Sequence, residues 1–226
     1  MSNYWINFWN NNHIVEGKSV HEKIGRTIAG EPISEEKWDQ CLLFLRRQLE
    51  LQRHDILLDI GAGSGAICIP FSRQVEKVVA VDVSEKLLAS IQKRKNLQKI
   101  ASDILTLNFP AAAFTKVIFY FAIQHFDEGE VVNLLKKIFS WLSDGGILYI
   151  GDVPLLDKKF DYFKIDDYEK AYFESIAAGK PIIGNWYNED FFLKLGKYIG
   201  FSETLIVYQP TDFINAHYRF DVKFIK

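Results

Sequence analysis

ILLDIGAGSGAICI, residues 56–69, is the stretch of sequence that decides the fold. An apolar, strand-like run reaches Asp59, and three glycines then follow at the alternate positions 61, 63 and 65. Glycine has no Cβ, so such a loop adopts positive φ values and lets a ligand approach the backbone closely. A helix after the loop would add backbone N–H groups at its N-terminus. The pattern therefore predicts a nucleotide-like ligand at the end of a strand.

Strand-like and helix-like segments alternate along the chain from residue 56 onward. Strand-like apolar runs cover residues 56–60, 78–83, 100–105, 117–123 and 146–153, and helix-like segments with apolar residues three and four apart cover residues 85–97 and 129–142. This alternation is typical of βαβ units and predicts an α/β fold with a mostly parallel sheet. Residues 203–209 and 217–225 alternate apolar with polar side chains, which predicts two edge or antiparallel strands.

Two regions lie outside this alternation. Residues 1–50 contain an aromatic group, a loop and a predicted helix, and we interpret them as a lid or substrate-side segment. Residues 51–226 form the predicted ligand-binding domain, and its aromatic-rich stretch at about 154–200 is interpreted as a substrate-side insertion that ends in a helix. A chain of 226 residues with 48% hydrophobic residues is long enough for one compact domain with such an elaboration.

Composition excludes several classes of partner. The net charge is −2 and the basic residues are scattered, so we expect no nucleic-acid partner. No apolar run approaches the length of a membrane span, and the first residues do not resemble a signal peptide, so we expect a cytoplasmic protein, monomeric or homodimeric, without a membrane partner. Cys41 and Cys68 are predicted to be buried free thiols, and no spacing of ligands suggests a metal site.

Two ligands are compatible with the glycine loop. Gly61, Gly63 and Ala66 satisfy the dinucleotide pattern G-x-G-x-x-G/A, and Asp82 follows at about the spacing expected for NAD. A short-chain dehydrogenase should also carry a Tyr-x-x-x-Lys pair, and no tyrosine of this chain has a lysine four residues later. An NAD-dependent dehydrogenase is therefore the weakest of the alternatives.

The fuller pattern, Asp-x-Gly-x-Gly-x-Gly over residues 59–65, resembles the cofactor loop of class I S-adenosylmethionine-dependent methyltransferases. The resemblance covers roughly residues 55–153 and implies a Rossmann-like, seven-stranded, mostly parallel sheet with an antiparallel last strand and helices on both faces. It also implies S-adenosylmethionine as cofactor, with S-adenosylhomocysteine as product. The cofactor-binding residues it implies are Asp59, Gly61, Ala62, Gly63, Gly65, Asp82, Val83, Leu87, Asp103, Ile104, Tyr120, Phe121 and Ala122.

The chemistry of this cofactor suits the acids near the loop. S-adenosylmethionine has no phosphate and needs carboxylates for its ribose hydroxyls and its ammonium group, and Asp82 is placed to accept from both hydroxyls. Each acid also has a structural alternative. Asp59 is able to bond nearby loop amides, Asp82 to begin a helix, and Asp103 to cap a turn.

Methyl transfer from a sulfonium needs mainly alignment and exclusion of water, and a base only where the acceptor must lose a proton. His125 follows the fourth strand, at the edge of the sheet where ligands bind, and is our candidate base because its ordinary pKa suits neutral pH. The alternative is a loop histidine bonded to backbone or packed beside Phe126. Asp152, at the end of the fifth strand, is the second candidate, and its alternative is a turn before Val153 and Pro154.

The flanking segments supply candidates for the rest of the site. Arg26 is placed to pair with the methionine carboxylate, or else is a surface arginine. The aromatic residues considered for an acceptor pocket, of which we expect only one or two to contact substrate, are Tyr4, Trp5, Phe8, Trp9, Tyr172, Trp186 and Tyr187.

The resemblance implies a methyltransferase but does not specify its acceptor. The Asn/Asp-Pro-Pro-Tyr/Phe string of DNA and protein-glutamine methyltransferases is absent after the fourth strand, where the chain reads FAIQHF. We therefore expect a small-molecule acceptor. O-methylation of a sugar, polysaccharide precursor or other metabolite hydroxyl is the first hypothesis; N-methylation of a small amine and a non-catalytic cofactor-binding module are the alternatives.

Overall fold

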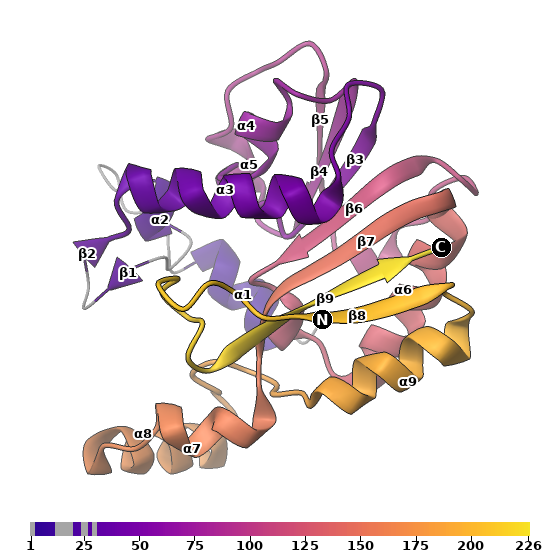
Figure 1. The fold of residues 1–226 in the computed structure, drawn as a ribbon. Helices are drawn as coiled ribbons and strands as arrows, with labels where there is room; N and C mark the ends of the chain where they lie inside the picture. Colours follow the sequence, from indigo (N-terminus) through magenta and orange to yellow (C-terminus); the bar gives the residue numbers. More distant parts are fainter. Residues whose placement is uncertain (1–2, 12–19, 24–26, 29–30) are drawn as a thin grey trace.

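The structure is a computed structural model that describes residues 3–11, 20–23, 27–28 and 31–226. Its centre is a seven-stranded sheet with the strand order β5-β4-β3-β6-β7-β9-β8 (Figure 1). The strands are β3 (Ile56–Ile60), β4 (Lys77–Asp82), β5 (Leu97–Ala101), β6 (Phe114–Tyr120), β7 (Leu142–Pro154), β8 (Glu203–Val207) and β9 (Arg219–Ile225). Strands β3 to β7 are parallel, whereas β9 is antiparallel to both β7 and β8. The predicted α/β sheet with an antiparallel last strand is confirmed.

The strand order places a switch point between β3 and β6. The chain runs outward from β3 through β4 to β5 and then returns to pair β6 with the other side of β3. Ligands of open α/β sheets bind beyond the carboxyl ends of the strands at such a point. The glycine loop that follows β3 begins at this position.

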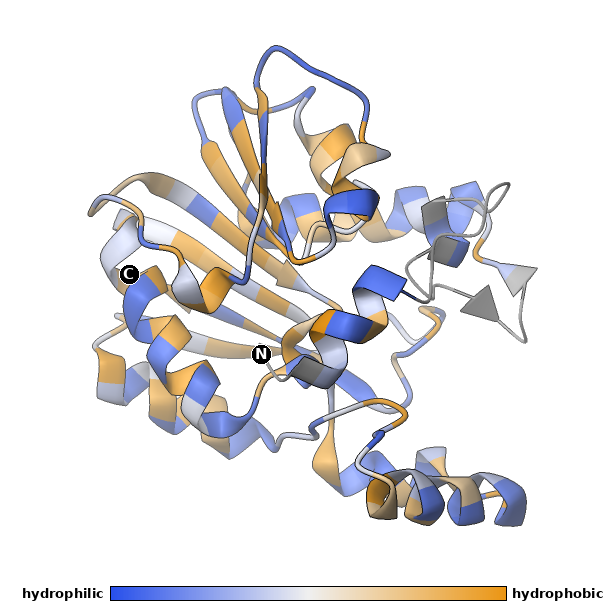
Figure 2. Cartoon of the chain, turned by 180° about the vertical axis from the view of Figure 1, so that it is seen from behind, coloured by the Kyte–Doolittle hydropathy of each residue, from blue (hydrophilic) through white to orange (hydrophobic). Residues whose placement is uncertain are grey.

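Helices cover both faces of the sheet. They are α3 (Glu35–Leu49), α4 (Cys68–Phe71), α5 (Glu85–Ala89), α6 (Glu128–Trp141) and α9 (Glu189–Ile199). Successive strand residues point to opposite faces, so Leu57 packs in the core with α3 and α4, and Leu58 packs in the core with α6 and α9. Figure 2 shows the hydrophobic residues gathered along the strands between these layers.

The remaining elements lie around the sheet ends. They are α1 (Asn3–Asn11), α2 (Val20–Lys23), β1 (Thr27–Ile28), β2 (Glu31–Pro32), η1 (Ile104–Thr106), η2 (Ile123–His125), η3 (Leu156–Lys158), α7 (Lys159–Tyr162) and α8 (Asp166–Ala177). Helices α7 and α8 extend away from the body of the molecule (Figure 1). Within the described ranges, no helix combines the length and the apolar character that crossing a membrane requires.

Three local predictions were wrong. The helix expected over residues 85–97 ends after Ala89, and the chain then turns so that the Asn96 amide donates to the carbonyls of Ser72 and Val75. The strand expected over residues 100–105 lies earlier, at Leu97–Ala101, because the Asp103 side chain accepts from the Leu105 N–H and caps η1. No helix begins directly at the glycine loop, since the four-residue α4 starts only at Cys68.

Candidate cofactor pocket

The glycine loop has the backbone conformation that its sequence predicts. Gly61, Gly63 and Gly65 have φ values of 72°, 53° and 93°, in the region that residues with a Cβ rarely adopt. A Cβ on Gly61 would lie 2.8 Å from the Cβ of Ala122, just after β6. The loop therefore packs closely against the end of β6, and a larger residue at position 61 would push the two apart.

Asp82 ties this loop to the end of β4. Its Oδ2 accepts from the Gly63 N–H at 2.8 Å and its Oδ1 accepts from the Ser84 N–H at 2.8 Å. Burial raises the pKa of Asp82 above its ordinary value, while these backbone N–H groups act in the opposite direction. Each carboxylate oxygen has two lone pairs, so both oxygens keep acceptor capacity for a ligand. Asp82 is both a structural anchor and a candidate ligand residue.

Asp59 presents a buried acceptor that the protein itself does not satisfy. Its side chain is 2% exposed, and Oδ2 has no hydrogen-bond partner. Burial, and then the charge of Asp82, raise the pKa of Asp59 to about 7, whereas the backbone N–H of Cys68 lowers it. A buried acceptor without a partner is costly. A ligand with an N–H or a positive charge would satisfy Asp59 and offset the repulsion between the two acids.

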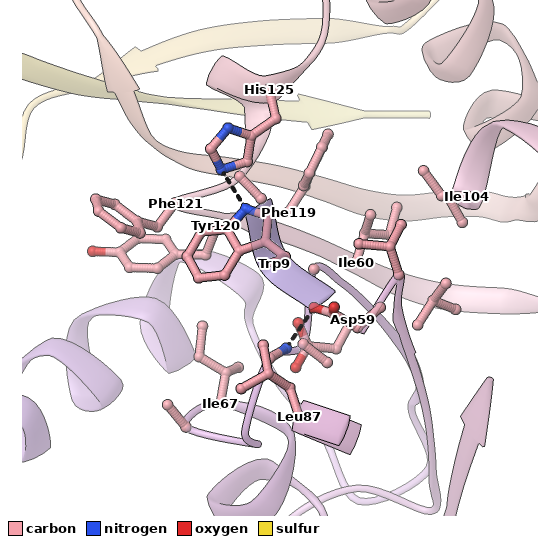
Figure 3. A pocket seen from close by; sticks show the side chains of 18 of the residues that line it. Trp9, Asp59, Ile60, Ile67, Leu87, Ile104, Phe119, Tyr120, Phe121 and His125 are labelled. Carbon is pink, nitrogen blue, oxygen red and sulfur yellow. Dashed lines mark hydrogen bonds between the residues drawn. The ribbon is translucent and has the colours of Figure 1, made fainter. Parts of the chain in front are cut away.

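These acids form one wall of a pocket that is open to solvent at its mouth (Figure 3). The predicted cofactor residues that line it are Asp59, Gly61, Ala62, Gly63, Asp82, Val83, Leu87, Asp103, Ile104, Tyr120, Phe121 and Ala122. Two predicted residues do not belong to this lining. Gly65 shapes the loop beneath, where a Cβ would meet Ile69 at 2.7 Å, and Arg26 lies outside the described residues.

Eight further residues line the pocket that the sequence did not predict, and all but Ser102 are apolar or aromatic. They are Trp38, Ile60, Ala66, Ile67, Val81, Ser102, Phe119 and Phe126. Trp38 comes from α3, far away in the chain, and its indole N–H donates to the Ala66 carbonyl at 3.2 Å. No local pattern distinguishes these residues from ordinary core residues, because their role depends on which strand ends meet. Most of the wall is apolar, which suits a ligand held by a few polar groups.

His125 lies on η2, which forms one end of the pocket. Its Nε2 accepts from the indole N–H of Trp9 on α1 at 3.2 Å (Figure 3), and its ring lies 4.1 Å, centre to centre, from that of Trp5. Burial, and then the positive charge of Arg219, lower the pKa of His125 to about 3. The ring is therefore neutral, and because Nε2 accepts, the proton resides on Nδ1.

Asp152, the second candidate base, does not line the pocket that contains His125. It is 1% exposed, has a φ of 63°, and accepts from the amide of Asn215 at 3.1 Å. Arg219 forms an ion pair with it at 3.9 Å and donates to its carbonyl. Asp152 lines a smaller, separate cavity near Gln209. Its contacts are those of a buried structural network.

Of the aromatic candidates, two contact cavities near His125. Trp9 lines the cofactor pocket, and Trp5 lines a neighbouring cavity. Tyr187 is a core residue that donates to the Phe126 carbonyl, and Tyr172 and Trp186 pack against Phe163 in a separate aromatic group. Cys41 and Cys68 are buried free thiols, as predicted.

Known proteins resemble both the sequence and the fold. Residues 57–146 match a family model described as a methyltransferase domain. Phosphoethanolamine N-methyltransferase of Plasmodium falciparum is 27% identical over 155 residues, which cover 66% of this chain and 57% of that protein. The chain thus spans little more than half the length of this curated relative.

Two solved structures share the fold over most of the chain. An S-adenosylmethionine-dependent methyltransferase from Mesorhizobium loti is 18% identical with a TM-score of 0.65, covering 84% of this chain and all of that one. A methyltransferase of the same cofactor class from Leishmania major is 12% identical with a TM-score of 0.68, covering 99% of this chain and 82% of that one.

The pocket fits the cofactor of these proteins. The unsatisfied oxygen of Asp59 suits an ammonium group, the glycine loop admits a close approach, and the apolar wall from Ile104 to Leu87 suits an adenine ring. The matched segment contains β3, the glycine loop, β4, β5 and β6, which together build this pocket. Residues 57–146 thus match the methyltransferase domain family, and the chain has the fold of S-adenosylmethionine-dependent methyltransferases.

Proposed function

We propose that the protein transfers a methyl group from S-adenosylmethionine to a small molecule bound beside η2, under helix α1. The single observation that carries this proposal is the continuous pocket from the acids Asp59 and Asp82 to the His125 end of β6. The acids would hold the ammonium and ribose ends of the cofactor, which supplies an already activated methyl group. The task left to the chain is to align the acceptor and to exclude water.

The pocket is built for exclusion of water at its His125 end. Trp9 and Phe121 line it there, and the bond from Trp9 to His125 holds α1 at this end of the pocket. His125 itself is 7% exposed. A buried, largely apolar site strengthens the electrostatic contacts made within it.

The protonation state of His125 affects which class of methyl acceptor the site suits. An aliphatic hydroxyl needs a base, but a pKa of about 3 makes His125 a weak one, and its Nε2 lone pair is directed to Trp9. An amine loses its proton to solvent more readily and needs no strong base in the site. We therefore favour N-methylation of a small amine, and O-methylation of a sugar or other metabolite hydroxyl becomes the second candidate. The N-methylating relative from Plasmodium supports the same order.

The experiment that tests this function has two parts. Calorimetry measures binding of S-adenosylmethionine and S-adenosylhomocysteine to the purified chain, and methyl-labelled cofactor is then supplied with a size-fractionated metabolite extract. We expect micromolar binding and label in the small-molecule fraction. Label confined to polymer would exclude the small-molecule acceptor, and tight cofactor binding without any transfer would favour a non-catalytic module.

A further inference from the structure

One buried arginine joins the ends of β6, β7 and β9 next to the cofactor pocket. Arg219 begins β9 and is 4% exposed. Its guanidinium donates to the Asp152 carbonyl on β7, and the guanidinium carbon lies 4.8 Å from the centre of the Phe121 ring, just after β6. Phe121 lines the cofactor pocket (Figure 3), whereas Arg219 is not among the described residues that line it. Arg219 therefore contacts the pocket wall from behind.

The backbone on both sides of this contact has an unusual conformation. Phe121 and Asp152 have φ values of 58° and 63°, which residues with a Cβ rarely adopt. The Phe121 N–H donates to the Gly151 carbonyl at 3.0 Å, so the two unusual segments are bonded to each other. The pairing of β7 with β9 is also irregular between Ile150 and Val153. Such conformations persist only where surrounding contacts hold them, and they are frequent at functional sites.

The ion pair with Asp152 does not by itself explain where the guanidinium lies. An arginine that binds a carboxylate frequently forms two parallel N–H···O bonds. Here Nε of Arg219 lies 3.9 Å from Asp152 Oδ1, too far for a hydrogen bond, and is buried without a hydrogen-bond partner. The guanidinium instead packs against two rings, that of Phe121 at 4.8 Å and that of Tyr218 at 5.0 Å. Contact with these rings therefore helps to determine its position.

The contact lies at the η2 end of the pocket. Burial, and then the charge of Arg219, lower the pKa of His125 on η2, so the guanidinium is near that ring. Nε2 of Gln124, also on η2, donates to the Phe121 carbonyl at 3.0 Å. Phe121 is thus held through its N–H, its carbonyl and its ring, and Arg219 supplies a contact to the ring.

We propose that Arg219 is a positioning residue for methyl transfer, which holds the Phe121 ring in place at the end of the pocket where the acceptor binds. The inference rests on the proposed function. Transfer from a sulfonium requires the nucleophile, the methyl carbon and the sulfur in line, and a displacement of about 1 Å costs up to about 100-fold in rate. Arg219 contacts none of the reacting atoms and acts through Phe121.

Two variants separate this role from a structural one. Arg219→Lys keeps a positive charge beside Asp152 but loses the planar group that stacks on the Phe121 ring. If Arg219 served only to neutralise Asp152, lysine would replace it. Asn215→Ala is the matched control, because it removes a different hydrogen bond to Asp152, at 3.1 Å, and leaves the guanidinium on the ring. Phe121→Leu removes the ring itself.

The measurements are made on the full chain. Carbon-13 NMR of ring-labelled phenylalanine reports the surroundings of Phe121, whose signals are assigned by their loss in Phe121→Leu. Calorimetry gives the Kd of S-adenosylhomocysteine. Methyl-labelled S-adenosylmethionine, with a fixed amount of the small-molecule fraction of a metabolite extract, gives the maximal rate and the KM of the donor.

We expect Arg219→Lys to shift the Phe121 ring signals and to lower the maximal rate about tenfold, with less than a threefold change in donor KM and in the Kd of S-adenosylhomocysteine. Asn215→Ala should leave the ring signals in place and change the rate less than twofold. Phe121→Leu should also lower the rate about tenfold. Adding Arg219→Lys to it should then change the rate less than twofold further, because the arginine acts through the ring.

Unchanged ring signals or a wild-type rate in Arg219→Lys would overturn the inference, as would losses that multiply to about 100-fold in the double variant. Loss of S-adenosylhomocysteine binding in Arg219→Lys, or an equal loss of rate in Asn215→Ala, would make the role structural and also overturn it. If the ring signals shift in Arg219→Lys but the wild-type chain transfers no label to any fraction, the proposed function is refuted, and the contact by which Arg219 holds Phe121 is not.

Discussion

The indole N–H of Trp9 donates to Nε2 of His125 at 3.2 Å, so a residue of the N-terminal helix decides which nitrogen of the pocket imidazole carries the proton. The two residues are 116 positions apart in the chain. The bond leaves the ring proton of the neutral imidazole on Nδ1. It also occupies the Nε2 lone pair, which is then not available to take a proton from a substrate. The same bond joins α1 to η2, at one end of the cofactor pocket.

The charge state of His125 is directly measurable. Because burial and Arg219 lower its pKa to about 3, we expect the ring to stay neutral, as the Nδ1–H tautomer, from about pH 8 down to about pH 4. Nitrogen-15 NMR of the imidazole measures both properties. Trp9→Phe keeps an aromatic ring but removes the donor, and should shift the tautomer population toward Nε2–H. A His125 signal that titrates near pH 6.5 would contradict the neutral, buried assignment.

The role of His125 in turnover follows from the same contacts. Because a pKa of about 3 makes His125 a weak base, we expect His125→Gln to reduce kcat only about tenfold, through lost positioning, and to change the affinity for S-adenosylmethionine less than threefold. Steady-state kinetics with calorimetry of the cofactor measures both quantities. A pH profile of kcat in the wild type distinguishes a base from a positioning group, because a group that stays neutral adds no inflection between about pH 5 and pH 8. Unchanged kcat in the variant would remove His125 from the reaction.

Cofactor affinity should depend on the ionisation of Asp59. Its pKa in the free protein is raised to about 7, and a positively charged ligand group binds the ionised form, so protonation competes with binding as the pH falls. We expect affinity for S-adenosylmethionine to be about tenfold weaker at about pH 6 than at about pH 8. Calorimetry at both pH values measures this ratio. Asp59→Asn should bind weakly and without the pH dependence; a variant that retains the full ratio would assign it to another group.

Asp82 combines a ligand role with an anchor role, and two variants separate them. Asp82→Ala removes both oxygens and should weaken S-adenosylmethionine binding at least tenfold. Asp82→Asn keeps one oxygen that is able to accept from the Gly63 N–H, so we expect it to preserve the thermal midpoint better than Asp82→Ala. Calorimetry and thermal unfolding measure the two effects. Unchanged cofactor affinity in Asp82→Ala would exclude Asp82 from the binding site.

The Gly61→Ala substitution tests whether the loop needs a residue without a Cβ at position 61. Gly61→Ala places a Cβ 2.8 Å from that of Ala122 at a φ of 72°, so we expect a loss of about 1–2 kcal/mol in the free energy of unfolding from the backbone conformation alone. Cofactor binding should fall with it, because the loop must move. Gly145→Ala is the matched control, since φ is also 72° there but nothing lies within 4 Å. Equal cofactor affinity in the two variants would exclude a special role for position 61.

Much of the sheet was predictable from local sequence. Strands β3, β4, β6, β7, β8 and β9 lie where apolar runs or alternation indicated them, and α3, α6 and α9 lie where helical periodicity indicated them. The predictions were wrong where a polar side chain forms hydrogen bonds with the backbone, either of a distant segment or at the start of a short helix. Asn96 holds the chain to the loop after α4, and Asp103 caps η1, so residues between them could not be assigned from periodicity.

The part of the candidate cofactor site that lies at the carboxyl ends of the strands was predictable. A glycine loop, Asp59 and Asp82 must meet, because parallel strands present their carboxyl ends at one edge of the sheet. The placement of Trp38 and Trp9 in the wall was not predictable, since both come from N-terminal helices whose docking depends on tertiary packing. Arg26 stays a prediction.

The sequence by itself determined the α/β fold and the placement of the glycine loop and the acids beside it, because these depend on residues that lie close together in the chain or at adjacent strand ends. Only the tertiary structure decided the state of His125 and the position of Asp152. The pKa of an imidazole depends on burial and on charges such as Arg219, which come from distant segments. A carboxylate placed at a strand end, as Asp152 is, faces a pocket or a buried network according to what packs over it.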